Sequence, residues 1–304
     1  MFESSIKILP IQESQVLVNT SSKKSKKKDK ELQRTKKWRK KRRGRWTGSQ
    51  LKNLMSSGPG KSKLKWDNLD RVYSFGATSV KYIYENSMER KTGRYIEDGE
   101  GTEAMRYGTK VEPLIRKRTK ELLEEMKVVG KLKDVGFKTF DNLKTAGVSS
   151  DSILVNDKGE TIASVEMKAC TSWGTHYERT YDIMTDSSKD FWQVQGQTVA
   201  HNVPICYYVV AEPPQNIRDY LYYDRDIKDL YRQFKKECKV SIQIVMKSEQ
   251  HCEALIKRII LAEETIRDFK ETNYTEKLKP LLENNIKIHE DKPEKFERYL
   301  KKAS

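Results

Sequence analysis

Residues 153–168 have the pattern of a β-hairpin whose second strand is half buried. The apolar run 153–155 leads into Asn156-Asp157-Lys158-Gly159, a sequence typical of a hairpin turn. From residue 161 to residue 168 apolar and polar residues alternate, as expected for a strand with one buried face. The apolar face is expected to hold Ala163, Val165 and Met167, and the other face Ser164, Glu166 and Lys168.

Helical and extended patterns surround this hairpin. Helices are predicted over 50–55, 69–88, 103–129, 187–202 and 250–270, and further strands over 135–137, 146–148, 205–211 and 240–246. Pro113 is expected to make the third of these helices start or kink near Thr109. The order of elements predicts an α+β (α/β) fold, with a mixed central sheet, the hairpin at its centre and helices around it.

The positive charge is concentrated near the N-terminus. The chain of 304 residues has a net charge of +16, but residues 23–45 alone carry +13. Such a block is usually disordered when free and often contacts nucleic acid, although a solubilising tail or a nuclear-import signal has the same composition. We therefore expect a flexible leader and basic tail (1–41), a folded domain (42–247) and a helical C-terminal extension (248–304).

Several classes of protein are excluded. No apolar run approaches the ~18 residues of a membrane-spanning helix, and residues 1–20 lack the pattern of a secretory signal. The four cysteines, Cys170, Cys206, Cys238 and Cys252, form no disulfide framework, C-x-x-C pair or zinc spacing. An intracellular, cytoplasmic protein is expected, or a nuclear one in a eukaryotic host, with no membrane partner.

A charged trio marks the candidate site. Asp151 precedes the hairpin, and Glu166 and Lys168 share one face of its second strand, so all three side chains are expected to meet at one end of the sheet. Two carboxylates can hold Mg²⁺ through hard oxygen ligands, and a lysine can orient a metal-bound hydroxide and offset developing negative charge. The pattern fits a minimal phosphodiesterase site. An ordinary ion pair on an exposed strand has the same spacing.

Four segments in order resemble the YqaJ-type viral recombinase family, the lambda-exonuclease-like branch of the PD-(D/E)XK nucleases. They are Arg42 to Ser49 (RRGRWTGS), Met105 to Glu112 (MRYGTKVE), Gly147 to Ile153 with Val165 to Lys168 (VEMK), and Phe191 to Gln197 (FWQVQGQ). The resemblance implies a restriction-endonuclease-like core. The family's proline and glycine around the aspartate are Ser150 and Ser152 here, and its K-C-P is Lys168-Ala169-Cys170. Some relatives carry an iron–sulfur cluster, but this chain lacks the cysteine set, so we expect none.

The resemblance also implies roles for individual residues. It implies that Asp151, Glu166, Glu112 and the main-chain carbonyl of Met167 ligate Mg²⁺, or Mn²⁺ in its place, and that Lys168 and Gln193 act in catalysis. Arg42, with Ser49 and Arg45 near it, is expected to bind the 5′-phosphate of a DNA end. Other basic residues are expected to contact DNA without sequence preference: Lys36, Lys37, Arg39, Lys40, Lys41 and Arg43.

Three of these assignments have alternatives. Thr109 to Glu112 also fits a capping box, in which Glu112 bonds the backbone rather than a metal. Gln193 also fits a surface helix residue. Arg42 fits one phosphate contact among the many that a basic tail makes.

Together these features predict a metal-dependent deoxyribonuclease, most simply a 5′→3′ exonuclease on linear duplex DNA that serves recombination or repair. The resemblance further implies a phage or prophage origin and a single-strand annealing protein as partner, and relatives can form homo-oligomeric rings. An endonuclease or structure-specific nuclease with the same core is an alternative. A catalytically inactive, basic nucleic-acid-binding protein is another.

Overall fold

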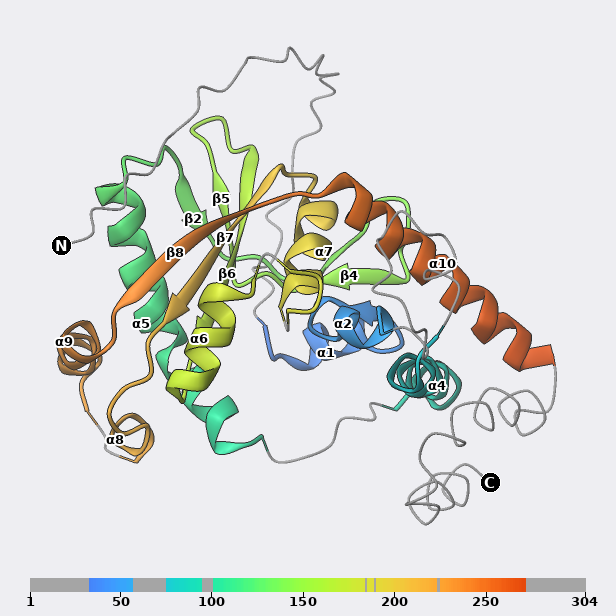
Figure 1. The fold of residues 1–304 in the computed structure, drawn as a ribbon, viewed down its shortest axis with the longest axis horizontal. Helices are drawn as coiled ribbons and strands as arrows, with labels where there is room; N and C mark the ends of the chain where they lie inside the picture. Colours follow the sequence, from blue (N-terminus) through green and yellow to red (C-terminus); the bar gives the residue numbers. More distant parts are fainter. Residues whose placement is uncertain are drawn as a thin grey trace. The chain divides into compact units, whose positions relative to one another are not determined.

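The computed structural model describes residues 33–56, 75–94, 101–183, 185–188, 190–222 and 225–271, and a five-stranded sheet lies at the centre of these ranges (Figure 1). The strand order is β2-β5-β6-β7-β8, in which β6 and β7 are parallel and all other neighbours are antiparallel. The strands span Lys131–Lys133 (β2), Ser152–Val155 (β5), Thr161–Ala169 (β6), Ile205–Ala211 (β7) and Val240–Met246 (β8). This arrangement confirms the predicted mixed sheet with the hairpin β5-β6 at its centre.

The turn between β5 and β6 fixes the register of the hairpin. Asn156 Oδ1 accepts hydrogen bonds from the peptide N–H groups of Lys158 and Glu160, and Gly159 has a positive φ of 80°. Asparagine side chains make such bonds readily, and glycine adopts positive φ without steric cost. In the resulting register Ser152 lies opposite Val165. Asp151, one residue earlier, therefore lies at the level of Glu166.

Different helices cover the two faces of the sheet. α5 (Glu103–Glu125) packs on the face that carries Ala163, Val165 and Met167, where Val111 and Leu114 join their apolar cluster. α7 (Phe191–His201) packs against β6 and β7 from the other side. This confirms the predicted alternation along β6, but Ser164 and Glu166 on the second face are buried as well, so the expectation of a half-buried strand is wrong. Because α7 lies over the face with Glu166 and Lys168, helix and strand enclose these two charges.

α5 begins where the helix over 103–129 was predicted to begin but ends four residues earlier. It starts at Glu103, where the Thr102 hydroxyl accepts a hydrogen bond from the peptide N–H of Met105 at 3.3 Å, and it ends at Glu125. Pro113 lies inside the helix, so the expected start near Thr109 is wrong. Proline removes one helical N–H donor, but the apolar face of α5 remains packed on the sheet on both sides of it.

A second, three-stranded sheet carries the N-terminal motif. β1 (Trp46–Thr47) is parallel to β4 (Ala146–Val148), which pairs antiparallel with β3 (Lys138–Thr139). The strand predicted over 135–137 is wrong: Phe137 instead packs its ring against Gly147, where an added Cβ would lie 2.6 Å from its Cζ. Parallel strands end at the same edge, so the segments that follow β1 and β4 lie side by side.

The remaining elements include several that the sequence did not suggest. They are α1 (Lys36–Arg42), η1 (Gly48–Gln50), α2 (Leu51–Leu54), α4 (Ala77–Thr92), α6 (Trp173–Tyr181), α8 (Arg218–Leu221), α9 (Ile227–Glu237) and α10 (Glu249–Glu271). α2, α4, α7 and α10 share an apolar cluster that includes Trp46, Leu54, Ile83, Trp192 and Leu255. α1 crosses the domain boundary predicted after residue 41.

Some predictions lie outside the described ranges: those for residues 1–32 and 272–304, and for the first part of the helix over 69–88. In the described part of the chain, no helix is long and apolar enough to cross a membrane.

Candidate active site

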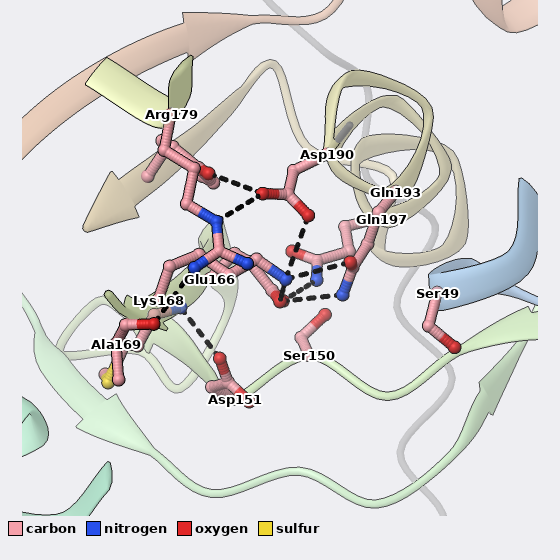
Figure 2. Close-up of polar contacts among 12 residues, drawn as sticks. Ser49, Ser150, Asp151, Glu166, Lys168, Ala169, Arg179, Asp190, Gln193 and Gln197 are labelled. Atoms are coloured by element: carbon pink, nitrogen blue, oxygen red, sulfur yellow. Dashed lines mark hydrogen bonds and ion pairs between the residues drawn. The ribbon is translucent and has the colours of Figure 1, made fainter. Parts of the chain in front are cut away.

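The end of β6 brings acidic and basic side chains together (Figure 2). Glu166 and Lys168 are two residues apart on the strand and project from the same face. Asp151 lies just before β5, and its Oδ2 accepts a hydrogen bond from the peptide N–H of Met167 at 2.7 Å. Asp151 is therefore anchored directly to the strand that carries the other two residues.

Side chains of α7 bind both carboxylate oxygens of Glu166. Gln193 Nε2 donates to Oε1 at 2.7 Å, and Gln197 Nε2 donates to Oε2. Glu166 is only 3% exposed, so these bonds replace the water that it would otherwise bind. The alternative that Gln193 is an exposed helix residue is wrong. Gln197 was missed, although its i,i+4 spacing from Gln193 places both amides on one helix face.

Three acceptors hold the Lys168 ammonium. They are Glu166 Oε1 at 2.7 Å, Gln193 Oε1 at 3.0 Å and Asp190 Oδ1 at 3.3 Å. Burial by itself lowers the pKa of Lys168, but the carboxylates of Glu166 and Asp190 outweigh burial and raise it. Lys168 is therefore a fixed cation beside Glu166.

Asp190 is a functional candidate that the sequence did not single out. Its Oδ2 accepts hydrogen bonds from Arg179 Nε at 3.1 Å and from the Tyr208 hydroxyl at 2.8 Å. Burial by itself raises the pKa of Asp190, but Lys168 and Arg179 lower it to about 2. An aspartate directly before a helix is commonly an N-cap residue, so the sequence does not distinguish a capping aspartate from one that belongs to the site.

Negative charge accumulates around Asp151. Burial raises the pKa of Asp151 well above its ordinary value, and the nearby carboxylates of Glu166 and Glu112 raise it further, against the opposing effect of Lys168. Its Oδ1 has no hydrogen-bond partner among the described residues. A cation bound here would relieve this repulsion.

Glu112 reaches the same region from α5. Its Oε2 lies 2.9 Å from Arg34 Nη2, and its Oε1 lies 3.3 Å from Arg116 Nη2. The capping-box alternative is wrong, because Thr102 caps α5 and the Thr109 hydroxyl donates to the carbonyl of Met105 inside the helix.

Asp151 and Glu166 are the candidate ligands of a divalent metal ion. Among the described residues, no group of three or more His, Cys, Asp or Glu side chains is placed to hold a metal ion as it stands. Asp151 and Glu166 nevertheless offer hard carboxylate oxygens, and such oxygens suit Mg²⁺ or Mn²⁺ rather than a soft metal. The residues present therefore fit such an ion, with two carboxylates as its anchor.

A buried arginine lies beside this centre. Arg42 is 9% exposed, its Nη1 donates to Ser149 Oγ and its Nη2 to Ser49 Oγ, both at 3.3 Å. The Trp38 ring lies 4.3 Å from its Cζ, and the Trp38 indole N–H donates to Ser149 Oγ at 2.9 Å. Arg42 Nε has no hydrogen-bond partner, and within the described ranges no carboxylate pairs with this guanidinium. A buried cation without a counterion is costly, so the Arg42 guanidinium is suited to binding an anionic ligand.

The other basic residues near the N-terminus lie elsewhere. Arg45 donates through Nε to the carbonyl of Lys144 at 3.0 Å and through Nη1 to that of Lys41, so both of these donors are directed to main-chain carbonyls rather than to the Arg42 site. Arg43 donates to the carbonyl of Gly93. The remaining predicted DNA contacts are exposed residues on α1: Lys36, Lys37, Arg39, Lys40 and Lys41.

Ser150, at the position of the family's proline, is fully buried. Its hydroxyl and His201 Nε2 form a hydrogen bond of 3.0 Å. Burial lowers the pKa of His201 to about 4, so the imidazole is neutral at pH 7. No sequence motif indicates this contact, because the two residues lie 51 positions apart in the chain.

Solved exonuclease structures share this fold. An alkaline exonuclease (LHK-Exo) from Laribacter hongkongensis is 21% identical, with a TM-score of 0.51 over 78% of this chain and 97% of its own. Its complex with dAMP gives 20% identity and a TM-score of 0.52 over the same shares. A phage-related exonuclease from Haemophilus somnus 129PT is 15% identical, with a TM-score of 0.51 over 75% of this chain and 95% of its own. No protein-family model and no curated protein sequence matches the chain. At these identities the likeness establishes the fold.

Proposed function

We propose that this protein is a metal-dependent deoxyribonuclease of the YqaJ/lambda-exonuclease-like type, which degrades linear duplex DNA from its 5′ ends. The observation that carries the proposal is the cluster of Asp151, Glu166, Lys168 and Gln193 at one end of a sheet. The shared fold of the neighbouring exonucleases supports the same reaction class.

Each residue of the cluster has a distinct chemical role in this proposal. Asp151 and Glu166, with the Met167 carbonyl and Glu112 near them, would hold Mg²⁺ or Mn²⁺, which supplies an acidified water and polarises the phosphate. Lys168 offsets the negative charge that develops on the phosphate in the transition state. Gln193, which bridges Glu166 and Lys168, orients the attacking water.

The buried Arg42 guanidinium supports a preference for a DNA end. A terminal 5′-phosphate would neutralise the buried guanidinium and supply an acceptor for its unpaired Nε–H. One neighbour is described in complex with dAMP, and a deoxynucleoside monophosphate is the unit that such an enzyme releases. The single strand left behind suits a role in recombination or repair beside an annealing protein.

The test is digestion of linear duplex DNA labelled at its 5′ or 3′ end, with a closed circle as control. Wild type with Mg²⁺ is expected to release the 5′ label first and to spare the circle. Lys168→Ala is expected to lower the rate by about 10²–10³-fold while DNA binding is retained. Lys158→Ala, at an exposed lysine in the turn of the same hairpin, is expected to keep full activity.

Other outcomes select other functions. Cleavage of the circle would identify an endonuclease. Tight DNA binding without metal-dependent cleavage by wild type would refute the catalytic proposal and leave a binding protein.

A further inference from the structure

Asp190 occupies the N-cap of α7 but does not cap it. An aspartate at this position normally accepts a hydrogen bond from a peptide N–H in the first turn. Asp190 makes no such bond, although its main-chain carbonyl accepts the first helical hydrogen bond, from Val194. Its carboxylate turns instead toward Lys168 and Arg179 (Figure 2). It also accepts a hydrogen bond from the Tyr208 hydroxyl. The lost capping bond indicates that the side chain serves the site rather than the helix.

The carboxylate of Asp190 is held from several sides. It is 5% exposed, and its Oδ2 is occupied by Arg179 Nε and the Tyr208 hydroxyl. Arg179 also donates through Nη1 to the carbonyl of Ala169 at 2.9 Å, one residue beyond Lys168. α6, α7 and the end of β6 are therefore tied together at this carboxylate, and the remaining oxygen, Oδ1, faces the Lys168 ammonium at 3.3 Å.

Lys168 has a specific need for such a partner. An ammonium group has three N–H donors, and its three acceptors come from Glu166, Gln193 and Asp190. In the proposed function Glu166 binds the metal and Gln193 the water, so both have a second duty during the reaction. Asp190 has no second duty, and its charge keeps the ammonium in place when Glu166 and Gln193 change orientation.

We propose that Asp190 is a positioning residue that fixes the Lys168 ammonium at the reacting phosphate. This inference rests on the proposed function, because Lys168 needs a fixed position only if it acts in cleavage.

The first experiment compares kcat and KM for DNA cleavage among three variants. Asp190→Asn keeps the size of the side chain and an acceptor for Tyr208 but removes the charge that faces Lys168. We expect kcat to fall about 10-fold to 100-fold with KM nearly unchanged, as for a small displacement of a reacting group. Tyr208→Phe removes only the hydrogen bond from the Tyr208 hydroxyl to Asp190 Oδ2, so its kcat should fall much less. Asp226→Asn is the matched control, because Asp226 does cap its helix, α9, by accepting from the peptide N–H of Lys228.

The second experiment measures thermal unfolding of the metal-free protein as a double-mutant cycle. Removing either Asp190 or Lys168 deprives the other buried charge of one ion-pair partner, whereas the double variant loses that ion pair only once. Asp190→Asn together with Lys168→Met should therefore lower Tm by less than the sum of the two single variants.

The outcomes separate the two claims. A Tm loss that is simply additive, an unchanged kcat in Asp190→Asn, or equal kcat losses in Asp190→Asn and Tyr208→Phe would each overturn the positioning role. A wild type that does not cleave DNA would refute the proposed function, and the positioning role with it.

Discussion

At the scale of single residues, Ser150 shows how this chain presents Asp151 without the family's proline. A proline fixes φ by its ring. Here the Ser150 hydroxyl bonds His201, and the Ser150 carbonyl accepts a hydrogen bond from Gln33 Nε2 at 2.8 Å. Side-chain hydrogen bonds from α7 and from the segment before α1 thus replace covalent restriction of the turn before Asp151.

This contact predicts a pH dependence of stability. The folded-state pKa of His201 is lowered from 6.5 to about 4. Below pH 6.5 the unfolded chain binds a proton that the folded protein does not, so stability is lost as the pH falls toward 4. This group alone should remove about 2 kcal/mol of unfolding free energy between pH 7 and pH 4.5. His201→Gln keeps hydrogen-bonding atoms but does not titrate. Its free energy of unfolding, measured with urea, should therefore fall by about 2 kcal/mol less than that of wild type between pH 7 and pH 4.5.

The control for this prediction is His176→Gln, which leaves the Ser150 contact intact and should keep the wild-type dependence. If wild type and His201→Gln lose stability in parallel over this pH range, His201 does not carry the effect.

At the scale of elements, α1 is a helix in a segment whose composition predicted a flexible tail. A run of lysines and arginines suggests a tail, but both residue types form helices well. Thr35 caps the helix, since its side chain accepts a hydrogen bond from the peptide N–H of Trp38. Only the i,i+4 pair of Trp38 and Arg42 marks an inward face. A pair is too short a pattern to distinguish from chance within a basic run.

The same reasoning explains which other parts were predictable. The long strands β6, β7 and β8 were found because alternation or an apolar run persisted over at least seven residues. β1 and β3 have two residues each, too few to show any period. In the site, the trio followed from the strand period and Gln193 from the resemblance. Asp190 belongs to no pattern, because only tertiary structure turns its side chain toward Lys168.

Docking of α1 predicts a role for Trp38 in end recognition. Trp38→Ala removes the ring that stacks on the Arg42 guanidinium and the indole bond to Ser149. Stacking of this kind contributes about 1 kcal/mol or more when partly desolvated. The preference for 5′-phosphorylated over 5′-hydroxyl ends, measured as a ratio of kcat/KM, should therefore fall about fivefold or more.

Two further variants calibrate this measurement. Trp38→Phe retains a ring and should lose less of the preference, and Lys37→Ala, at an exposed neighbour on α1, should lose none. An unchanged ratio in Trp38→Ala, alongside a reduced ratio in Arg42→Ala, would show that Arg42 needs no support from α1.

At the scale of the whole molecule, the net charge of +16 divides into two kinds of cation. Arg42 is buried, whereas the lysines on α1 are exposed. Six more lysines lie between residues 23 and 30, outside the described ranges. A buried guanidinium selects one anion by geometry, but exposed cations bind any phosphate backbone and release counterions. Affinity for duplex DNA and recognition of its end should therefore be separable.

The separation is tested by neutralising the six lysines in the full-length chain. The variant carries glutamine at Lys23, Lys24, Lys26, Lys27, Lys28 and Lys30. Each phosphate contact contributes about 0.9 to the slope of log K against log salt, so the slope should become shallower by up to about 5. Fluorescence anisotropy with duplex DNA over a range of NaCl concentrations, with Ca²⁺ in place of Mg²⁺, measures this slope.

Cleavage at saturating DNA and the 5′-phosphate preference of the glutamine variant should stay at the wild-type level. Arg42→Ala should lower the 5′-phosphate preference and leave the slope of log K against log salt unchanged. An unchanged slope in the glutamine variant would mean that the basic segment adds no phosphate contacts.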